Sequence, residues 1–124
     1  MPQMTGAEAV VEMLRREGVS MVFGIPGVHA LGIYNVLVDC PDIEHINVRH
    51  EQAAGFMADA YARATRGIGV ALVTPGPGAG NSITAMGESY ASSTPVLYLI
   101  PQIKSTLVDS GKGSIHEYKD HFNM

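Results

Sequence analysis

Four short apolar runs alternate with four helical patterns along the chain, and this alternation constrains the fold more than any other feature. The apolar runs, which we expect to form strands, cover residues 21–23, 43–48, 70–73 and 96–100. Apolar residues recur at helical spacing within residues 7–14, 31–38, 51–66 and 83–90. Strands that alternate with helices are typical of a parallel sheet covered by helices on both faces. We therefore predict an α/β fold in a single domain, which suits a length of 124 residues.

Capping and turn residues separate these segments. Thr5 and Glu8 form a capping-box pattern at the start of the first helix, and Gly18 can end that helix. Residues 74–80 are rich in glycine and proline, and we expect them to form a loop that leads into the fourth helix. After Pro101 the periodic pattern fades, so we expect irregular structure there.

Residues with unusual chemistry follow the predicted strands. They lie in the segments 24–27, 49–51, 74–81 and 116–117. In a parallel sheet with helices on both faces, the ligand crevice lies beyond the carboxyl ends of the strands. We therefore expect these four segments to meet at one edge of the sheet, although they are far apart in the sequence.

The segment 74–81, Thr-Pro-Gly-Pro-Gly-Ala-Gly-Asn, places glycines between a strand and a helix. Such glycines let a ligand approach the backbone and expose the amino end of the helix. A dinucleotide-binding fingerprint that starts at Gly76 and Gly78 would need glycine where the chain has Asn81. A P-loop is also excluded, because no Gly-Lys-Ser/Thr follows. A tight turn with an Asn cap is an alternative that this segment alone leaves open.

Glu51 stands at the start of the third predicted helix, directly after His50. A zinc protease motif would need histidine at the position of Ala54, so that class is excluded. In isolation, a carboxylate here is explained by the positive end of the helix dipole. Its expected neighbours, the 24–27 turn and the 74–81 segment, favour a functional role, because all three should lie at the same edge.

Four motifs occur in order along the chain. They are Phe-Gly-Ile-Pro-Gly at 23–27, Arg-His-Glu-Gln-Ala-Ala at 49–54, Phe-Met-Ala-Asp-Ala-Tyr-Ala-Arg-Ala at 56–64 and Gly-Pro-Gly-Ala-Gly-Asn at 76–81. Together they resemble the pyrimidine-binding domain of thiamine-diphosphate-dependent enzymes in the acetolactate synthase and pyruvate oxidase group. The resemblance runs from about residue 5 to residue 117. It implies a flavodoxin-like thiamine-diphosphate-binding fold for residues 1–124.

The resemblance implies thiamine diphosphate as the cofactor. In that family, the glutamate matching Glu51 bonds the N1′ atom of the aminopyrimidine ring and promotes loss of the thiazolium C2 proton, so we expect Glu51 to be catalytic. The other positions that the resemblance assigns to cofactor binding are Pro26, Gly27, Val28, Thr74, Gly76, Pro77 and Asn81. Tyr61 and Arg63 lie well past the helix start, and we expect them to be structural.

Three departures from the family pattern point to a different substrate pocket from that of an ordinary acetolactate synthase. Many acetolactate synthases carry Gly-Ala where this chain has Val28-His29, Phe-Gln where it has Ile115-His116, and often Ser at Pro75. Pro-Gly-Val-His at 26–29, together with the glycine-rich approach to His116-Glu117, resembles the branch that contains 5-guanidino-2-oxopentanoate decarboxylase. The family equivalent of His116 faces the cofactor, so His116 is a candidate catalytic proton donor. For His29 we favour a polar loop residue with a backbone partner.

The resemblance also implies parts that these residues lack. The family binds the diphosphate through Mg²⁺ on a second domain, and no matching Gly-Asp-Gly segment occurs here, so we expect no metal ligand in this chain. We expect an amino-terminal domain, truncated before its natural end, of a decarboxylase or carboligase that acts on a 2-oxo acid. It should be inactive alone and need a diphosphate-binding domain, with the active site spanning a homodimer or a homotetramer. The alternatives are a natural α subunit of a two-chain 2-oxo-acid decarboxylase and a non-catalytic assembly module.

Composition and charge bear on the partners and the cellular compartment of the protein. The net charge is -4 and the basic residues are scattered, which disfavours nucleic acid as a partner. A single cysteine, Cys40, cannot form an internal disulfide and indicates a reducing compartment; we expect it to be inert. No secretory signal and no apolar run near the roughly 18 residues of a membrane span is visible. We therefore expect a cytoplasmic protein without a membrane partner, and we expect His45 and His121 at its surface.

Overall fold

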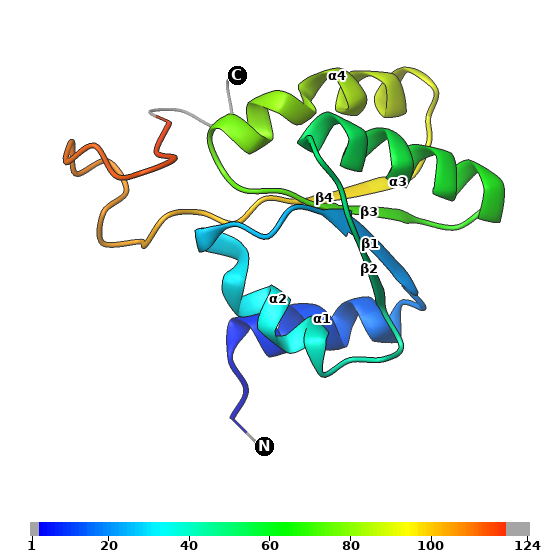
Figure 1. Cartoon of the computed structure of the whole chain (residues 1–124), viewed down its shortest axis with the longest axis horizontal. Coiled ribbons are helices and arrows are strands. Elements are labelled where there is room, and N and C mark those ends of the chain that lie inside the picture. Colours follow the sequence, from blue (N-terminus) through cyan, green and yellow to red (C-terminus); the bar gives the residue numbers. More distant parts are fainter. Residues whose placement is uncertain (1–2, 119–124) are drawn as a thin grey trace.

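The structure, a computed structural model, describes residues 3–118 and contains one four-stranded sheet (Figure 1). The strands are β1(Met21–Gly24), β2(Glu44–Asn47), β3(Gly69–Leu72) and β4(Val96–Leu99). Their order is β2-β1-β3-β4, and each neighbouring pair is parallel. All four residues of β3 are buried. The predicted parallel sheet is confirmed.

Helices cover both faces of this sheet, as predicted. They are α1(Gly6–Arg16), the 3-10 helix η1(Val28–Ala30), α2(Leu31–Val38), α3(Glu51–Thr65) and α4(Pro77–Ala91). Figure 1 shows α1 and α2 on one face and α3 and α4 on the other. The predicted capping box forms at α1, where Thr5 and Glu8 each accept from the other's backbone amide. Within residues 3–118, no helix is long and apolar enough to cross a bilayer.

Two hydrophobic cores hold the sheet between the helix layers. The core on the side of α1 and α2 includes Val11, Leu14, Val22, Tyr34, Leu37 and Leu72. The core on the side of α3 includes Phe23, Val48, Ala54, Ala58, Ala71 and Val73. Successive residues of β1 and β3 point to opposite cores, as the period of a strand requires. Because burial of each large apolar side chain contributes about 1.5–3 kcal/mol, the two cores fix the strand ends from which the site loops leave.

Small residues let α3 lie close to its neighbours. A side chain at Gly69, at the start of β3, would collide with the backbone carbonyl of Ala58. A Cβ atom at Gly55 would lie 2.6 Å from the Cβ of Ala85 on α4. The close contact of α3 with both β3 and α4 brings the amino ends of the two helices together.

Tyr61 and Arg63 have the structural roles that we expected. The Tyr61 hydroxyl lies 2.9 Å from the Ser20 hydroxyl. Arg63 Nε donates to Asp59 Oδ1 at 2.6 Å, and its Nη2 atom donates to Ser92 Oγ at 2.6 Å. The hydrogen bond from the guanidinium lowers the pKa of the buried Asp59 carboxyl. Arg63 thus joins α3 to the end of α4.

The fourth helix begins earlier than predicted. We expected residues 74–80 to be a loop, but α4 starts at Pro77, so residues 77–80 are helical. Proline suits the first position of a helix, because its fixed φ is helical and its missing N–H has no intrahelical acceptor there. Gly76 makes the turn into the helix with a φ of 61°. Gly76 is the N-cap residue, so the Asn cap that we kept as an alternative does not form.

His45 does not have the surface position that we expected. It lies on β2, and its ring packs edge-on against Tyr34 of α2 with a centroid distance of 4.8 Å. Its Nε2 atom is buried without a hydrogen-bond partner. Burial lowers the pKa of His45, so its neutral form is favoured. His121, the other histidine expected at the surface, lies outside the described residues.

Candidate functional site

The segments that follow β1, β2 and β3 meet at the carboxyl edge of the sheet, and the segment near residue 116 returns to the same edge (Figure 1). The Thr74 hydroxyl, which follows β3, lies 3.3 Å from Nδ1 of His116. Nε2 of His29, which follows β1, lies 3.1 Å from the carbonyl oxygen of Ile115. The juxtaposition predicted from the positions of the strands is therefore present.

The Glu51 side chain reaches from α3 to α4. Its neighbour His50 caps α3, because His50 Nδ1 accepts from the Gln52 amide at 3.2 Å. The Glu51 carboxylate instead accepts from Asn81 Nδ2 at 2.9 Å through its Oε2 atom. An ionised carboxylate has about four acceptor positions, so this hydrogen bond leaves acceptor capacity for a ligand. The helix dipole favours the charge, and Asn81 fixes where the charge points.

Gly78 forms the wall beside this carboxylate. A Cβ atom at Gly78 would lie 3.4 Å from Glu51 Oε1 and 2.7 Å from the methyl carbon of Thr74. Any side chain at this position would therefore press on Thr74. Gly78 is itself buried, and its lack of a side chain lets Thr74 and Glu51 pack closely against the first turn of α4.

Thr74 joins the loop after β1 to the segment near residue 116. A Cβ atom at Gly27 would lie 2.9 Å from Thr74 Oγ1, so only glycine lets the two loops pack this closely. The same hydroxyl faces the His116 ring. Thr74 thus lies between two of the segments predicted to reach the site.

His116 packs against the turn that begins α4. A side chain at Gly76 would collide with the His116 backbone. The His116 ring stands edge-on to the His29 ring, with a centroid distance of 5.6 Å and an angle of 70°. The close neighbour that glycine permits at position 76 is therefore the backbone of His116. His29 has the backbone partner that we favoured.

The remaining predicted site residues form an exposed rim. Pro26, Val28 and Pro77 are all exposed, and Val28 has 62% of its surface accessible. Pro26 lies on the loop after β1, Val28 begins η1 and Pro77 begins α4, all in the segments that follow β1 and β3. The structure thus brings Gly27, Thr74, Gly76 and His116 into contact with one another, pairs Glu51 with Asn81 on the other side of Gly78, and leaves the three rim residues open to solvent.

Two residues, Gly78 and His50, make contacts that were not predicted from the sequence. Gly78 was expected, with the other glycines of residues 74–81, to let a ligand approach the backbone, but in the structure it is buried and packs against Thr74 and Glu51. His50 was not expected to cap α3, because histidine is not among the preferred N-cap residues. The His50 cap could not be inferred from residue type, whereas a glycine inside the first turn of a helix is a signal that could have singled out Gly78.

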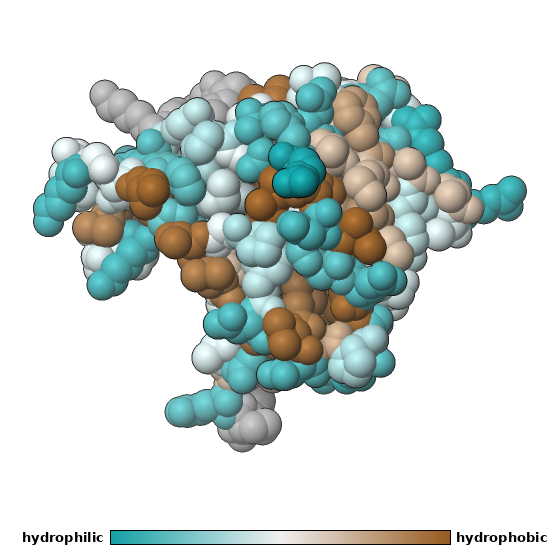
Figure 2. Space-filling model, in the orientation of Figure 1, coloured by the Kyte–Doolittle hydropathy of each residue, from teal (hydrophilic) through white to brown (hydrophobic). Residues whose placement is uncertain are grey.

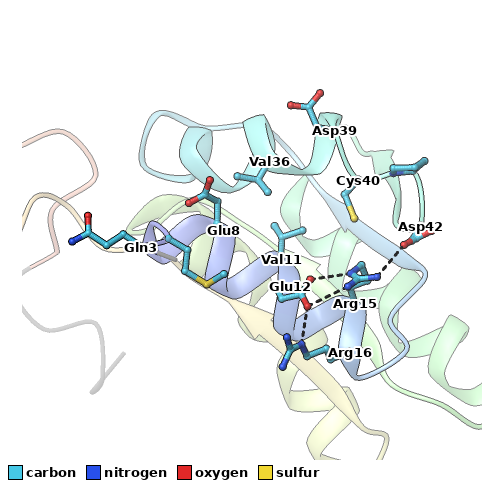
Figure 3. A pocket seen from close by; sticks show the side chains of 12 residues that line it. Gln3, Glu8, Val11, Glu12, Arg15, Arg16, Val36, Asp39, Cys40 and Asp42 are labelled. Carbon is cyan, nitrogen blue, oxygen red and sulfur yellow. Dashed lines mark hydrogen bonds and ion pairs between the residues drawn. The ribbon is translucent and has the colours of Figure 1, made fainter. Parts of the chain in front are cut away.

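A groove lies away from this edge. It measures about 580 Å³ and runs along α1 and the connection from α2 to β2. Figure 3 shows Arg15 in this groove, directed toward Glu12 and Asp42. The ion pairs measure 2.9 Å and 3.7 Å and join exposed side chains, which contribute little stability in water. None of the predicted site residues lines this groove.

Metal ligation has no candidate in the described part of the chain. Within residues 3–118, no three side chains of His, Cys, Asp or Glu are placed to hold an ion. The site at the carboxyl edge thus offers one carboxylate, one amide, one hydroxyl and two imidazoles. Such a set can hold a flat, nitrogen-bearing ring and move protons at it.

Comparison with known families gives a match over nearly the whole chain. A family described as "Thiamine pyrophosphate enzyme, N-terminal TPP binding domain" matches residues 4–124. The matched range includes every residue of the carboxyl-edge site.

Several curated proteins are similar in sequence. The acetolactate synthase large subunit of Haemophilus influenzae is 50% identical over 110 residues, which is 89% of this chain and 19% of that protein. A probable 2-ketoarginine decarboxylase of Pseudomonas aeruginosa is 45% identical over 121 residues, which is 98% of this chain and 22% of that protein. The acetolactate synthase isozyme 3 large subunit of Escherichia coli is 48% identical over 108 residues. The chain spans about a fifth of the length of these relatives.

Proposed function

The chain belongs to the family of amino-terminal TPP-binding domains of thiamine pyrophosphate enzymes, and on this premise we propose that its carboxyl edge binds and activates the aminopyrimidine ring of the cofactor in a 2-oxo-acid decarboxylase or carboligase. When bound, thiamine diphosphate supplies the electron sink for breaking the bond between the carboxylate and the carbonyl carbon of the substrate. The observation that carries the proposal is the partly buried Glu51 carboxylate, which accepts a hydrogen bond from Asn81 and packs beside Gly78 at the carboxyl edge of the sheet.

The residues at this edge fit an aminopyrimidine. Glu51 is partly buried, and Asn81 takes only one of its acceptor positions. A carboxyl group in such surroundings can share a proton with a ring nitrogen through a hydrogen bond. Partial exclusion of water strengthens that hydrogen bond. We assign Glu51 to hold a proton at N1′, and we assign Asn81 to orient the carboxylate.

The other predicted residues have supporting roles in this proposal. Gly27, Thr74 and Gly76 line the ring site, and Pro26, Val28 and Pro77 form its exposed rim. The His116 imidazole, 3.3 Å from the Thr74 hydroxyl, is proposed to donate a proton during turnover, because an imidazole ring nitrogen can act as a general acid. In this proposal Thr74 both orients His116 and forms part of the wall of the ring site.

The site needs partners that the described residues do not supply. We propose that Mg²⁺ and the diphosphate are held by another domain, from the same or a neighbouring subunit in a homodimer or homotetramer. Apolar residues also remain on the surface (Figure 2). The large apolar side chains exposed on α3 and α4 are Phe56, Met57, Ile83 and Tyr90. Their exposure supports a contact between these helices and another domain or subunit.

The substrate is proposed to be a 2-oxo acid, and two relatives favour different members of that class. Similarity to acetolactate synthases favours pyruvate, and similarity to the probable 2-ketoarginine decarboxylase favours an acid with a guanidino group. Val28-His29 and His116, where the chain departs from acetolactate synthases, favour the guanidino acid. A natural split subunit would use the same site with a separate partner chain.

The full-length protein and the 124-residue chain should be compared on a panel of 2-oxo acids that includes pyruvate and 5-guanidino-2-oxopentanoate. We expect the full-length protein with thiamine diphosphate and Mg²⁺ to release carbon dioxide from at least one acid. We expect no turnover from the chain alone, because the proposed diphosphate site is missing. A full-length protein that neither binds thiamine diphosphate nor consumes any 2-oxo acid would contradict the proposal and favour an assembly role.

A further inference from the structure

We propose that His29 is a positioning residue that holds the turn at residues 114–117 and so places His116 beside Thr74. This inference rests on the proposed function only in giving His116 a role in turnover. The contact itself joins residues 86 positions apart in the sequence, through Nε2 of His29 and the carbonyl oxygen of Ile115 at 3.1 Å.

The backbone of His116 requires such a support. Its φ is 65°, in the left-handed region that residues other than glycine rarely adopt. A residue stays in a sparsely populated conformation only when its surroundings determine it. His116 meets this condition, because its ring faces Thr74 and its backbone packs against Gly76.

Internal hydrogen bonds give the turn its shape. The Glu117 amide donates to the Ser114 carbonyl at 3.0 Å, and the Ser114 amide donates to the Glu117 carboxylate at 3.0 Å. These two bonds close the turn on itself but do not attach it to the sheet. The contacts made by His29, Thr74 and Gly76 supply that attachment.

His29 stands on a rigid support. It lies in η1, whose Ala30 amide donates to the Gly27 carbonyl at 2.8 Å, directly after the core strand β1. The adjacent Ala30 side chain is fully buried. A side chain anchored in this way can hold its partner at low entropic cost, because its own backbone is already fixed.

The direction of the His29 hydrogen bond explains why we assign it a positioning role. A carbonyl oxygen only accepts, so Nε2 of His29 must carry the proton and donate it. That proton is committed to the backbone of Ile115, whereas the His116 ring faces the site hydroxyl of Thr74. The edge-on contact of the two rings, with centroids 5.6 Å apart, adds a second restraint on His116.

The test compares four variants of the full-length holoenzyme with the wild type: His29→Ala, His29→Gln, His116→Ala and the double variant His29→Ala/His116→Ala. Hydrogen exchange of the backbone amides in residues 113–118 is measured by mass spectrometry. We expect His29→Ala to speed this exchange by roughly tenfold, the effect of losing one ordinary hydrogen bond. His29→Gln keeps a side-chain N–H donor and should restore most of the protection.

Turnover supplies the second measurement. His29→Ala should lower kcat by roughly tenfold and leave the dissociation constant for thiamine diphosphate within about twofold of the wild type. In the His116→Ala background, the His29→Ala change should lower kcat no further, because residues that act through one another are not additive. Unchanged amide exchange in His29→Ala, or an additive loss of kcat in the double variant, would overturn the inference. If no 2-oxo acid is turned over, the proposed function fails, and the amide exchange still decides whether His29 holds the turn.

Discussion

Glu51, Gly78 and Asn81 carry the site at the scale of single residues. The carboxylate comes from the first residue of α3, and the amide comes from the second turn of α4, 30 positions later in the sequence. Gly78, in the first turn of α4, has no side chain and so lets Thr74 and Glu51 pack against that turn. Each of the three has one physical task, so each can be tested by one substitution.

Gly78→Ala should weaken binding of thiamine diphosphate to the full-length protein. Its Cβ atom would lie 2.7 Å from Thr74 and 3.4 Å from the Glu51 carboxylate, and relief of such overpacking costs about 1–3 kcal/mol. We therefore expect the dissociation constant, measured by calorimetry with Mg²⁺ present, to rise by roughly tenfold or more.

Gly87→Ala is the matched control on the same helix. A Cβ atom at Gly87 meets nothing within 4 Å, so this change should stabilise α4 by about 0.5–1 kcal/mol and leave cofactor affinity unchanged. Equal affinities of the Gly78→Ala variant and the wild type would show that Gly78 does not form a wall of the ring site.

At the scale of elements, the alternation of apolar runs and helical patterns was enough to predict the parallel sheet and both helix layers. The start of α4 was predicted too late, because proline and glycine favour a loop on average, while Pro77 suits the first turn of a helix. The place of His45 was missed because β2 is an edge strand with polar residues, and nothing in its own pattern reveals that Tyr34 covers it.

His45 should make the stability of the full-length protein depend on pH. Burial lowers the pKa of His45 in the folded state, below the value of about 6.5 that it has when unfolded. The unfolded state therefore binds more protons as the pH falls through about 6.5. We expect the urea concentration at half-unfolding to decrease between pH 7.5 and pH 5.5.

His45→Phe is the control for this pH dependence. It keeps a ring against Tyr34 and removes the titrating group, so the decrease on acidification should be smaller in the variant. The carboxyls with lowered pKa values titrate below this pH range and do not contribute to the difference. An equal decrease in both proteins would mean that His45 is hydrated and free to protonate in the folded state.

At the scale of the whole molecule, the chain spans about a fifth of its curated relatives and presents its proposed ring site at an open edge. The gathering of four distant segments at that edge could be predicted from the alternation of strands and helices, since it implies a parallel sheet whose ligand crevice lies beyond the carboxyl ends of the strands. The partners within the site could not, because the hydrogen bonds of His29 with Ile115 and of Asn81 with Glu51 leave no periodic signal in the sequence. The central claim, that this edge activates a cofactor held partly by another domain, depends on the Glu51 carboxylate.

The exchange rate of the C2 proton of bound thiamine diphosphate, followed by NMR in the full-length protein, tests that claim most directly. Glu51→Gln should leave cofactor binding largely intact and slow the exchange by a factor on the order of 10²–10⁴, the usual contribution of a positioned acid or base. Glu44→Gln, which changes an exposed carboxylate at the other end of β2, should exchange at the wild-type rate. Exchange at the wild-type rate in Glu51→Gln with cofactor bound would contradict the account.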